Sequence, residues 1–428
     1  MSSMSVAQSS VLSFVAAQPL VDHHCHGVLR AGGDLAGLLN EADGAAAADG
    51  LAFDTLAGLA FRRWCPPLLG LDPHVTIEEY ARRRAELDAA EVNRRFLGAS
   101  GLRALCVDTG YAPADPAPGG DTDAGGAAAP ELLSPAATAG FAGAAGFEIV
   151  RLEQVAESLA ATGLSAADFP DAYRAALSER AAGRGGSGVR VVGLKSIAAY
   201  RVGLDLDGRR PCDADVVAAV ARWLGSGGST AGGGSGSGSG ESGSETGSAV
   251  GRGGVPRVAD EVLHRFFVWC GAELGLPIQF HVGYGDRDVD LQRCNPLLLT
   301  GLLRALEPTG APVMLLHNYP YHREAGYLAQ VFPLVYADLG LATHNTGARS
   351  AGLLGEALEL VPLRKFLFSS DAFGLPELYY LGTLLFRRAL SSFLARRLDD
   401  GDMSLADAER VTRLIGAENA LRAYRLDE

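Results

Sequence analysis

Lysine is almost missing from this 428-residue chain, which has 35 arginines but only two lysines, Lys195 and Lys365. Together with 55 glycines and abundant alanine, this composition is typical of a GC-rich genome. In such a background we expect a lysine at positions where arginine would not serve. The formal net charge is −13, and an excess of negative charge argues against nucleic acid or an anionic membrane as a partner.

Other features that are missing exclude further classes of protein. No apolar run is long enough to cross a membrane, which argues against an integral membrane protein. The first 20 residues lack both a basic segment and an apolar segment of signal-peptide length, so we expect no secretory signal. The six cysteines show no framework spacing, and a chain this long does not need disulfides. We therefore expect a protein of the reducing cytoplasm.

The chain does contain repeated apolar segments rich in β-branched residues, and its hydrophobic content of 48% suffices for a large core. Amphipathic segments such as 214–224 and 258–275 separate several of them. Alternating strands and helices predict an α/β fold with a parallel sheet. Eight strands predict a (β/α)8 TIM barrel formed by a single domain, residues 1–428. The predicted strands are 19–24, 102–109, 147–152, 189–195, 277–282, 312–317, 334–340 and 365–371.

Three segments interrupt this alternation. Residues 30–100 follow the first strand and contain helical stretches, which predicts a helical lid or insertion over the barrel mouth. Residues 112–136 are rich in Ala, Pro, Gly and Asp, and are expected to form a flexible loop. Residues 225–254 are a low-complexity Gly/Ser stretch that cannot bury a core. We interpret the last segment as a disordered insertion, because the strand–helix pattern resumes after it.

A third of the chain's nine histidines lie in the stretch "PLVDHHCHGVLR". Side chains alternate between the two faces of a strand. His24 and His26 are therefore expected on one side, as a shared metal ion requires. His23 and Cys25 are expected on the other side, facing the helices, with His23 in a packing role.

Several rare residues close the predicted strands, and active sites of (β/α)8 barrels lie at the carboxyl ends of the strands. A single strand-end histidine or aspartate is usually a packing or capping residue. The whole set, however, would converge on one mouth, and imidazoles with a carboxylate suit Zn²⁺. A bound zinc ion lowers the pKa of water to about 7 and so provides a hydroxide nucleophile. The set comprises His24, His26, Lys195, His281, His317 and Asp371.

The motifs around these residues resemble the amidohydrolase superfamily over most of residues 18–428. They are "VDHHCH", "VVGLKSIAAYR", "PIQFHVGYGD", "PVMLLHNYPYHREAGYLA", "KFLFSSDAFGLPELYYLG" and the closing "LIGAENALRAYRL". More narrowly, the chain resembles the amidohydrolase-related, metal-dependent TIM-barrel hydrolases. In some members of this group the barrel domain is fused to a glutamine-synthetase-like domain.

The resemblance implies roles for the strand-end residues. His24, His26, His281 and Asp371 would bind the metal, and Asp371 would also act as the catalytic base. His317 would be catalytic, either as a ligand of a second ion or as the group that polarises the substrate carbonyl.

The chemical state of Lys195 decides whether the site holds two metal ions or one, and the sequence leaves both possibilities open. If its amine is carboxylated, it is an anion that can bridge two metal ions. If it is unmodified, it is a cation, and it would pair with a substrate carboxylate beside a single ion. The expected cofactor is therefore one or two divalent ions, most simply zinc.

Three further residues are expected to contact the substrate: Arg201 after the fourth strand, and Tyr319 and Arg323 after the sixth. An arginine at the mouth suits a carboxylate. The expected partner is a small molecule, and a homo-oligomer is common for such barrels. The predicted function is hydrolysis of an amide or related C–N bond by metal-activated water. Alternatives are a decarboxylase or isomerase on the same barrel, and a non-catalytic scaffold that retains the metal site.

Overall fold

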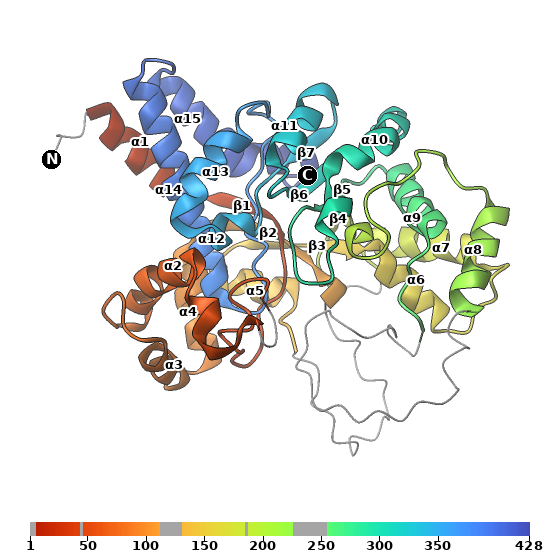
Figure 1. Cartoon of the computed structure of the whole chain (residues 1–428), viewed down its shortest axis with the longest axis horizontal. Helices are drawn as coiled ribbons and strands as arrows, with labels where there is room; N and C mark the ends of the chain where they lie inside the picture. Colours follow the sequence, from red (N-terminus) through yellow and green to blue (C-terminus); the bar gives the residue numbers. More distant parts are fainter. Residues whose placement is uncertain (1–5, 43–45, 112–130, 185–186, 226–254) are drawn as a thin grey trace.

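The computed structural model describes residues 6–42, 46–111, 131–184, 187–225 and 255–428 (Figure 1). The predicted Gly/Ser insertion at 225–254 lies outside the described residues except for Gly225, which ends a helix. Most of the predicted loop at 112–136 lies outside them too. Its last part is described, and a helix begins there at Pro135.

Seven strands form one parallel sheet in which each strand pairs with the next one along the chain. Nearly every strand residue is buried, which explains why the strands are apolar runs without alternation, as expected for a parallel sheet covered on both faces. The strands are β1 (Leu20–Cys25), β2 (Leu102–Asp108), β3 (Ala145–Arg151), β4 (Val191–Ser196), β5 (Ile278–Val282), β6 (Val313–His317) and β7 (Val335–Ala337).

The segment predicted as the eighth strand, 365–371, does not form a regular strand, but it bonds to both edges of the sheet. Towards β7, Leu367 N donates to Ala337 O at 3.0 Å. Towards β1, His23 N donates to Phe368 O at 3.1 Å. The predicted strand 334–340 is also shorter, because β7 ends at Ala337 and the chain beyond it turns into a short helix.

Helices cover the outside of the curled sheet, as Figure 1 shows for α6 to α9 on one side and α13 to α15 on the other. The helices are α1 (Val6–Ala17), α2 (Leu56–Trp64), α3 (Ile77–Ala85), α4 (Ala89–Ser100), α5 (Pro135–Ala142), α6 (Leu152–Ala160), α7 (Phe169–Ala181), α8 (Asp213–Gly225), α9 (Glu261–Glu273), α10 (Thr300–Leu306), α11 (His322–Val331), α12 (Ala342–Asn345), α13 (Ser350–Ala357), α14 (Pro376–Asp399), α15 (Leu405–Arg413) and α16 (Asn419–Tyr424). The predicted helical segments 214–224 and 258–275 correspond to α8 and α9.

The core has two parts. The larger part lies between the strands and the surrounding helices. A smaller, separate cluster combines strand residues such as Val21, Ile149 and Met314 with Tyr424 of α16. Because these strand residues come from all around the sheet, the second cluster is the inner core of the curl, and the C-terminal helix closes one end of it.

The segment 30–100 contains α2, α3 and α4, which lie together at one corner of the molecule in Figure 1. A buried ion pair links α3 to the first turn of α14. Glu377 is fully buried and accepts hydrogen bonds from Arg84 Nε at 2.6 Å and Tyr80 Oη at 2.9 Å. This carboxylate therefore fixes the helical segment to the helix that directly follows Asp371.

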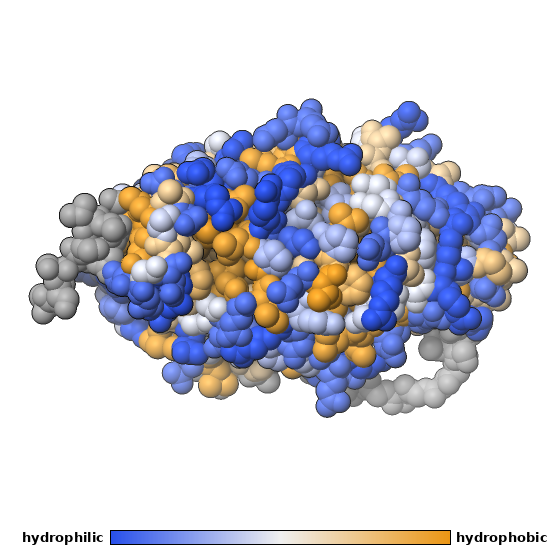
Figure 2. Space-filling view, turned by 90° about the horizontal axis from the view of Figure 1, so that it is seen from above, coloured by the Kyte–Doolittle hydropathy of each residue, from blue (hydrophilic) through white to orange (hydrophobic). Residues whose placement is uncertain are grey.

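The surface shown in Figure 2 is mixed, with hydrophobic patches among hydrophilic residues. Among the described residues, no helix combines the length and the hydrophobicity that crossing a membrane requires.

We predict that Glu377→Ala lowers the free energy of unfolding by about 3–5 kcal/mol, because it leaves the Arg84 guanidinium in a largely buried position without its partner. Denaturant unfolding followed by circular dichroism measures this change. The matched control is Glu359→Ala, which breaks an exposed pair with Arg323 and should leave stability unchanged. Equal effects of the two substitutions would contradict the anchoring role of Glu377.

Candidate metal centre

The geometry of β1 differs from the predicted alternation at the point where the histidines lie. The pairing of β1 with β2 changes register between Asp22 and Cys25, which inserts an irregularity into the strand. His23 is consequently not directed at the helices: its Nδ1 lies 2.9 Å from the hydroxyl of Tyr424 in the inner core. Its Nε2 lies 2.8 Å from Asp338 Oδ2. The prediction that His23 faces the helices around the sheet was wrong: it faces the inner core, which α16 closes, and its role there is structural.

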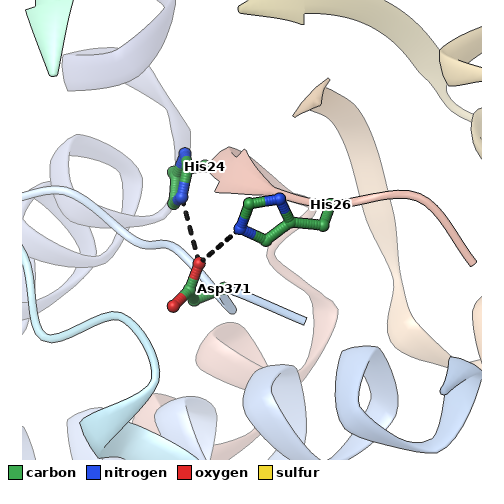
Figure 3. Close-up of side chains that lie close together, drawn as sticks. All are labelled: His24, His26 and Asp371. Carbon is green, nitrogen blue, oxygen red and sulfur yellow. Dashed lines mark ion pairs between the residues drawn. The ribbon is translucent and has the colours of Figure 1, made fainter. Parts of the chain in front are cut away.

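His24, His26 and Asp371 form a compact cluster at the carboxyl end of β1 (Figure 3). The Nε2 atoms of His24 and His26 lie 3.0 Å and 3.3 Å from the same oxygen, Asp371 Oδ1. One donor atom from each residue lies within 4.8 Å of the others. The cluster is nearly closed to solvent, since the Asp371 side chain is only 11% exposed. Two imidazole nitrogens and a carboxylate oxygen facing one point form a donor set for a divalent cation.

The backbone is strained where it presents these groups. Asp371 and His317 have φ angles of 51° and 70°, in the left-handed region that residues other than glycine seldom adopt. Asp371 is held in place by its backbone N, which donates to His24 O at 3.0 Å. Such strain persists only where the surrounding structure enforces it, and it concentrates at functional sites.

His317 and His281 extend the cluster along β6 and β5. The His317 and His281 rings are 4.7 Å apart between centroids, and His317 Nε2 lies 3.4 Å from Asp371 Oδ2. Among the described residues, neither ring nitrogen of the fully buried His317 has a hydrogen-bond partner. Buried polar atoms are normally satisfied, so this ring beside the cluster is a candidate to contact a ligand. Gly340 permits its position, because a Cβ there would lie 2.2 Å from His317 Nδ1.

Lys195 ends the fourth strand and reaches the cluster from the opposite side. Its Nζ lies 3.0 Å from His24 Nε2 and 3.3 Å from Asp108 Oδ2. The same Asp108 oxygen accepts from Arg151 Nη2 at 2.8 Å. An unmodified lysine ammonium can only donate, and His24 Nε2 would then face it and Asp371 with its lone pair. A lone pair and a carboxylate that face each other are stabilised by a cation between them.

The electrostatics of the cluster suit a metal ion. Burial, followed by the charge of Lys195, lowers the pKa of His24 to about 3. Burial also lowers the pKa of His317 well below its ordinary value. Burial would raise the pKa of Asp371, but the combined influence of His317, His24 and His26 outweighs it and holds the pKa well below 3.8. Neutral imidazoles and an ionised carboxylate are the forms that bind metal.

The three residues predicted to contact substrate lie in different surroundings, and not all of them are near the cluster. Tyr319 is 38% exposed and its ring meets that of Tyr284 with 6.1 Å between centroids. Arg201 is half-buried after η5 (Ala198–Tyr200), where its charge opposes the rise in the pKa of Glu157 that burial causes. Arg323 is not brought to the cluster: it lies on α11 and pairs with Glu359 at 2.9 Å, because α11 begins one residue before it and presents it outwards.

Sequence reasoning missed four residues of the centre or its support. Asp108 and Arg151 end β2 and β3, and the strand-end rule that selected Lys195 would also have found them. Asp338 follows β7 and accepts from His317 N at 2.6 Å. His344 on α12 is buried, has no partner for its Nδ1 and lies near the charge of Asp371. No strand-end signal marks His344, because a turn and part of a helix separate it from β7.

Comparisons with known proteins identify the family of the chain. A sequence model of the amidohydrolase family matches residues 190–426, more than half of the chain. The chain is 32% identical over 250 residues to Protein fluG of Emericella nidulans, covering 56% of this chain. It spans only 26% of the length of that relative.

Solved structures share the fold over nearly the whole chain. One from Lactobacillus casei, described provisionally as a metal-dependent hydrolase, has a TM-score of 0.74 and 28% identity, and the match covers 97% of this chain and 98% of that one. A uronate isomerase from Bacillus halodurans has a TM-score of 0.59 at 12% identity, with 99% and 97% coverage. A glucuronate isomerase from Caulobacter crescentus has a TM-score of 0.59 at 14% identity, with 99% and 94% coverage. The last two show similarity of fold alone.

A curled parallel α/β sheet with imidazoles and a carboxylate at its carboxyl end defines a class of metal-dependent enzyme folds. Within that class, this chain belongs to the amidohydrolase family. Membership implies a divalent metal ion as cofactor.

We predict that Asp108→Asn lowers the free energy of unfolding by about 3–5 kcal/mol, because it leaves the buried Arg151 and Lys195 without their shared carboxylate. Denaturant unfolding measures the change. Adding Arg151→Met to this variant removes one uncompensated charge and should restore part of the loss. Arg151→Met is also measured alone. If Arg151→Met lowers the stability of Asp108→Asn as much as it lowers that of the wild-type protein, Asp108 does not serve as the common counter-ion.

Proposed function

We propose that the protein is a metal-dependent hydrolase that cleaves an amide or related C–N bond of a small molecule. In this proposal His24, His26, His281 and Asp371 hold one zinc ion at the carboxyl end of a complete (β/α)8 barrel, with the segment 365–371 as its eighth member. The observation that carries it is the convergence of His24, His26 and Asp371 donor atoms within 4.8 Å, beside the His317 ring, whose nitrogens make no hydrogen bond among the described residues.

The chemistry divides between the ion and the chain. A bound zinc ion lowers the pKa of water to about 7 and thereby makes a nucleophile available near neutral pH. Asp371 is ionised and only 11% exposed, so it can take the proton of the attacking water and pass it to the leaving nitrogen. His317 is neutral, and its ring can donate a hydrogen bond to the carbonyl oxygen as negative charge develops there.

Lys195 supports a site with a single ion. Its nitrogen lies 3.3 Å from Asp108 Oδ2, in a position that suits an ammonium. A carboxylated lysine would place a second anion against that buried carboxylate, which is unfavourable. We therefore propose that Lys195 is unmodified and that His317 acts on the substrate instead of holding a second ion.

Hydrolysis is preferred over isomerisation because of the relatives. The protein described provisionally as a metal-dependent hydrolase has the higher identity, 28% against 12% and 14% for the isomerases. An isomerase or a decarboxylase on the same centre would still use the metal cluster, so the product of the reaction separates the three alternatives.

We predict that His24→Ala abolishes stable binding of zinc and lowers turnover by a factor of about 10³ or more, since the ion contributes several kcal/mol to the transition state. Metal content after gel filtration, measured by plasma mass spectrometry, checks the first part. His74→Ala, which replaces an exposed histidine of the helical segment, is the matched control and should retain the metal. Zinc retained by His24→Ala would sink the proposed ligand set.

The reaction itself is tested by incubating the zinc-loaded protein with N-acyl amino acids, N-acyl anilines, aromatic carboxylic acids and glucuronate. We expect release of an amine from one of the first two groups, and loss of this release in Asp371→Asn. Release of CO2 from the acids would establish decarboxylation instead, and conversion of glucuronate to its keto isomer would establish isomerisation.

The single-ion design predicts about one zinc per chain and a Lys195 peptide of unmodified mass after growth in bicarbonate-rich medium. Because carboxylated lysine is labile, ¹³C NMR of intact protein equilibrated with ¹³C-bicarbonate complements the mass measurement. Two zinc ions per chain together with a carbamate signal would contradict this design.

A further inference from the structure

Four aromatic side chains lie at the carboxyl end of the sheet, where the metal centre is, each in a different segment. Tyr200 follows β4, Tyr284 follows β5, Tyr319 follows β6 and Phe373 follows the segment 365–371. Aromatic residues make up only 7% of the chain, so their presence after three neighbouring strands and after the segment 365–371 is a concentration. We refer to these four residues as the aromatic rim.

Two members of the aromatic rim touch the imidazoles of the cluster directly. The Phe373 ring meets His26 edge-on at 5.8 Å between centroids, and the Tyr200 ring lies 4.5 Å from that of His281. The absence of a side chain at Gly285 permits the second contact, because a Cβ there would lie 2.2 Å from Tyr200 Oη.

The other two members form the outer part of the rim. Tyr284 and Tyr319 meet edge-on with their centroids 6.1 Å apart. Tyr284 lies three residues after His281, and its backbone N donates to Tyr319 O at 2.8 Å, so the chain segments after β5 and β6 meet at this point. The rim therefore extends from the imidazoles outwards to the exposed Tyr319.

The rings of the aromatic rim are not part of the closed core. Tyr200, Tyr284 and Phe373 are partly exposed, and Tyr319 is 38% exposed. Aromatic surface kept in contact with water beside a reactive centre costs hydrophobic free energy that a bound apolar group would recover.

We propose that the substrate carries an aromatic ring next to its scissile carbonyl, and that the aromatic rim binds this ring by edge-to-face and stacked contacts. This inference rests on the proposed function, since it assumes that the carbonyl lies at the metal centre.

Aromatic side chains bind cations as well as neutral rings. A cationic substituent next to the scissile carbonyl would lie beside the bound divalent ion, which repels it directly. A neutral ring has no such penalty, and contacts between aromatic rings favour it over a saturated ring of similar size.

Hydroxamates test the proposal because their two oxygens bind a metal ion whatever group they carry. We would measure the affinity of the zinc-loaded protein for acetohydroxamate, benzohydroxamate and cyclohexanecarbohydroxamate by calorimetry. Benzohydroxamate should bind about tenfold more tightly than the cyclohexane compound of similar size, as expected for favourable contacts with more than one ring.

Variants then locate the preference. Tyr284→Leu should lower the ratio of the benzohydroxamate to cyclohexanecarbohydroxamate affinities about threefold, and Tyr284→Leu with Tyr319→Leu should bring it near one. Acetohydroxamate affinity and zinc content should not change. Tyr327→Leu is the matched control, because this tyrosine is 47% exposed on α11 outside the rim, and it should keep the wild-type ratio.

The outcomes separate the two proposals. If acetohydroxamate does not bind in a zinc-dependent manner, the metal centre itself is wrong. If all three hydroxamates bind but the wild-type ratio is near one, or if the Tyr284 variants keep the wild-type ratio, the aromatic substrate is excluded while the proposed hydrolase stands.

Discussion

The structure depends on one carboxylate, that of Asp371, which three imidazoles approach from two strands. His24 and His26 face one of its oxygens and His317 faces the other. Such a group of donors is unfavourable in a protein interior unless hydrogen bonds or a cation compensate for the lost hydration. The fold brings these donors together by strained backbone at Asp371 and His317, and a divalent ion would make that arrangement favourable.

A second layer of charge surrounds this centre. Asp108 joins Lys195 and Arg151, while Asp338 links His23 to the backbone of His317. The carboxylates of Asp108 and Asp338 are not part of the cluster, but they orient groups that contact it. Outer residues of this kind set the direction and basicity of metal ligands, so the centre extends over β2, β3 and the end of β7 as well as the strands that carry its imidazoles.

Much of this could be predicted from the sequence, because buried parallel strands are visible as apolar runs and their ends mark one face of the sheet. Seven predicted strands correspond to β1 to β7, and His24, His26, His317, Lys195 and Asp371 meet there. The direction of His23 could not be predicted, because a register shift in β1 breaks the alternation on which that prediction depended. The closing segment 365–371 was predicted as a strand, yet its polar "SSD" end forms side-chain bonds with Asp22. His344 was missed because it reaches the centre from a helix.

The most direct test of the account is a crystal structure of the zinc-loaded protein with anomalous scattering at the zinc edge. The account predicts one ion bound by His24, His26, His281 and Asp371 at about 2.0–2.2 Å from each donor atom. An anomalous peak elsewhere, or none at this cluster in protein shown to contain zinc, would contradict it.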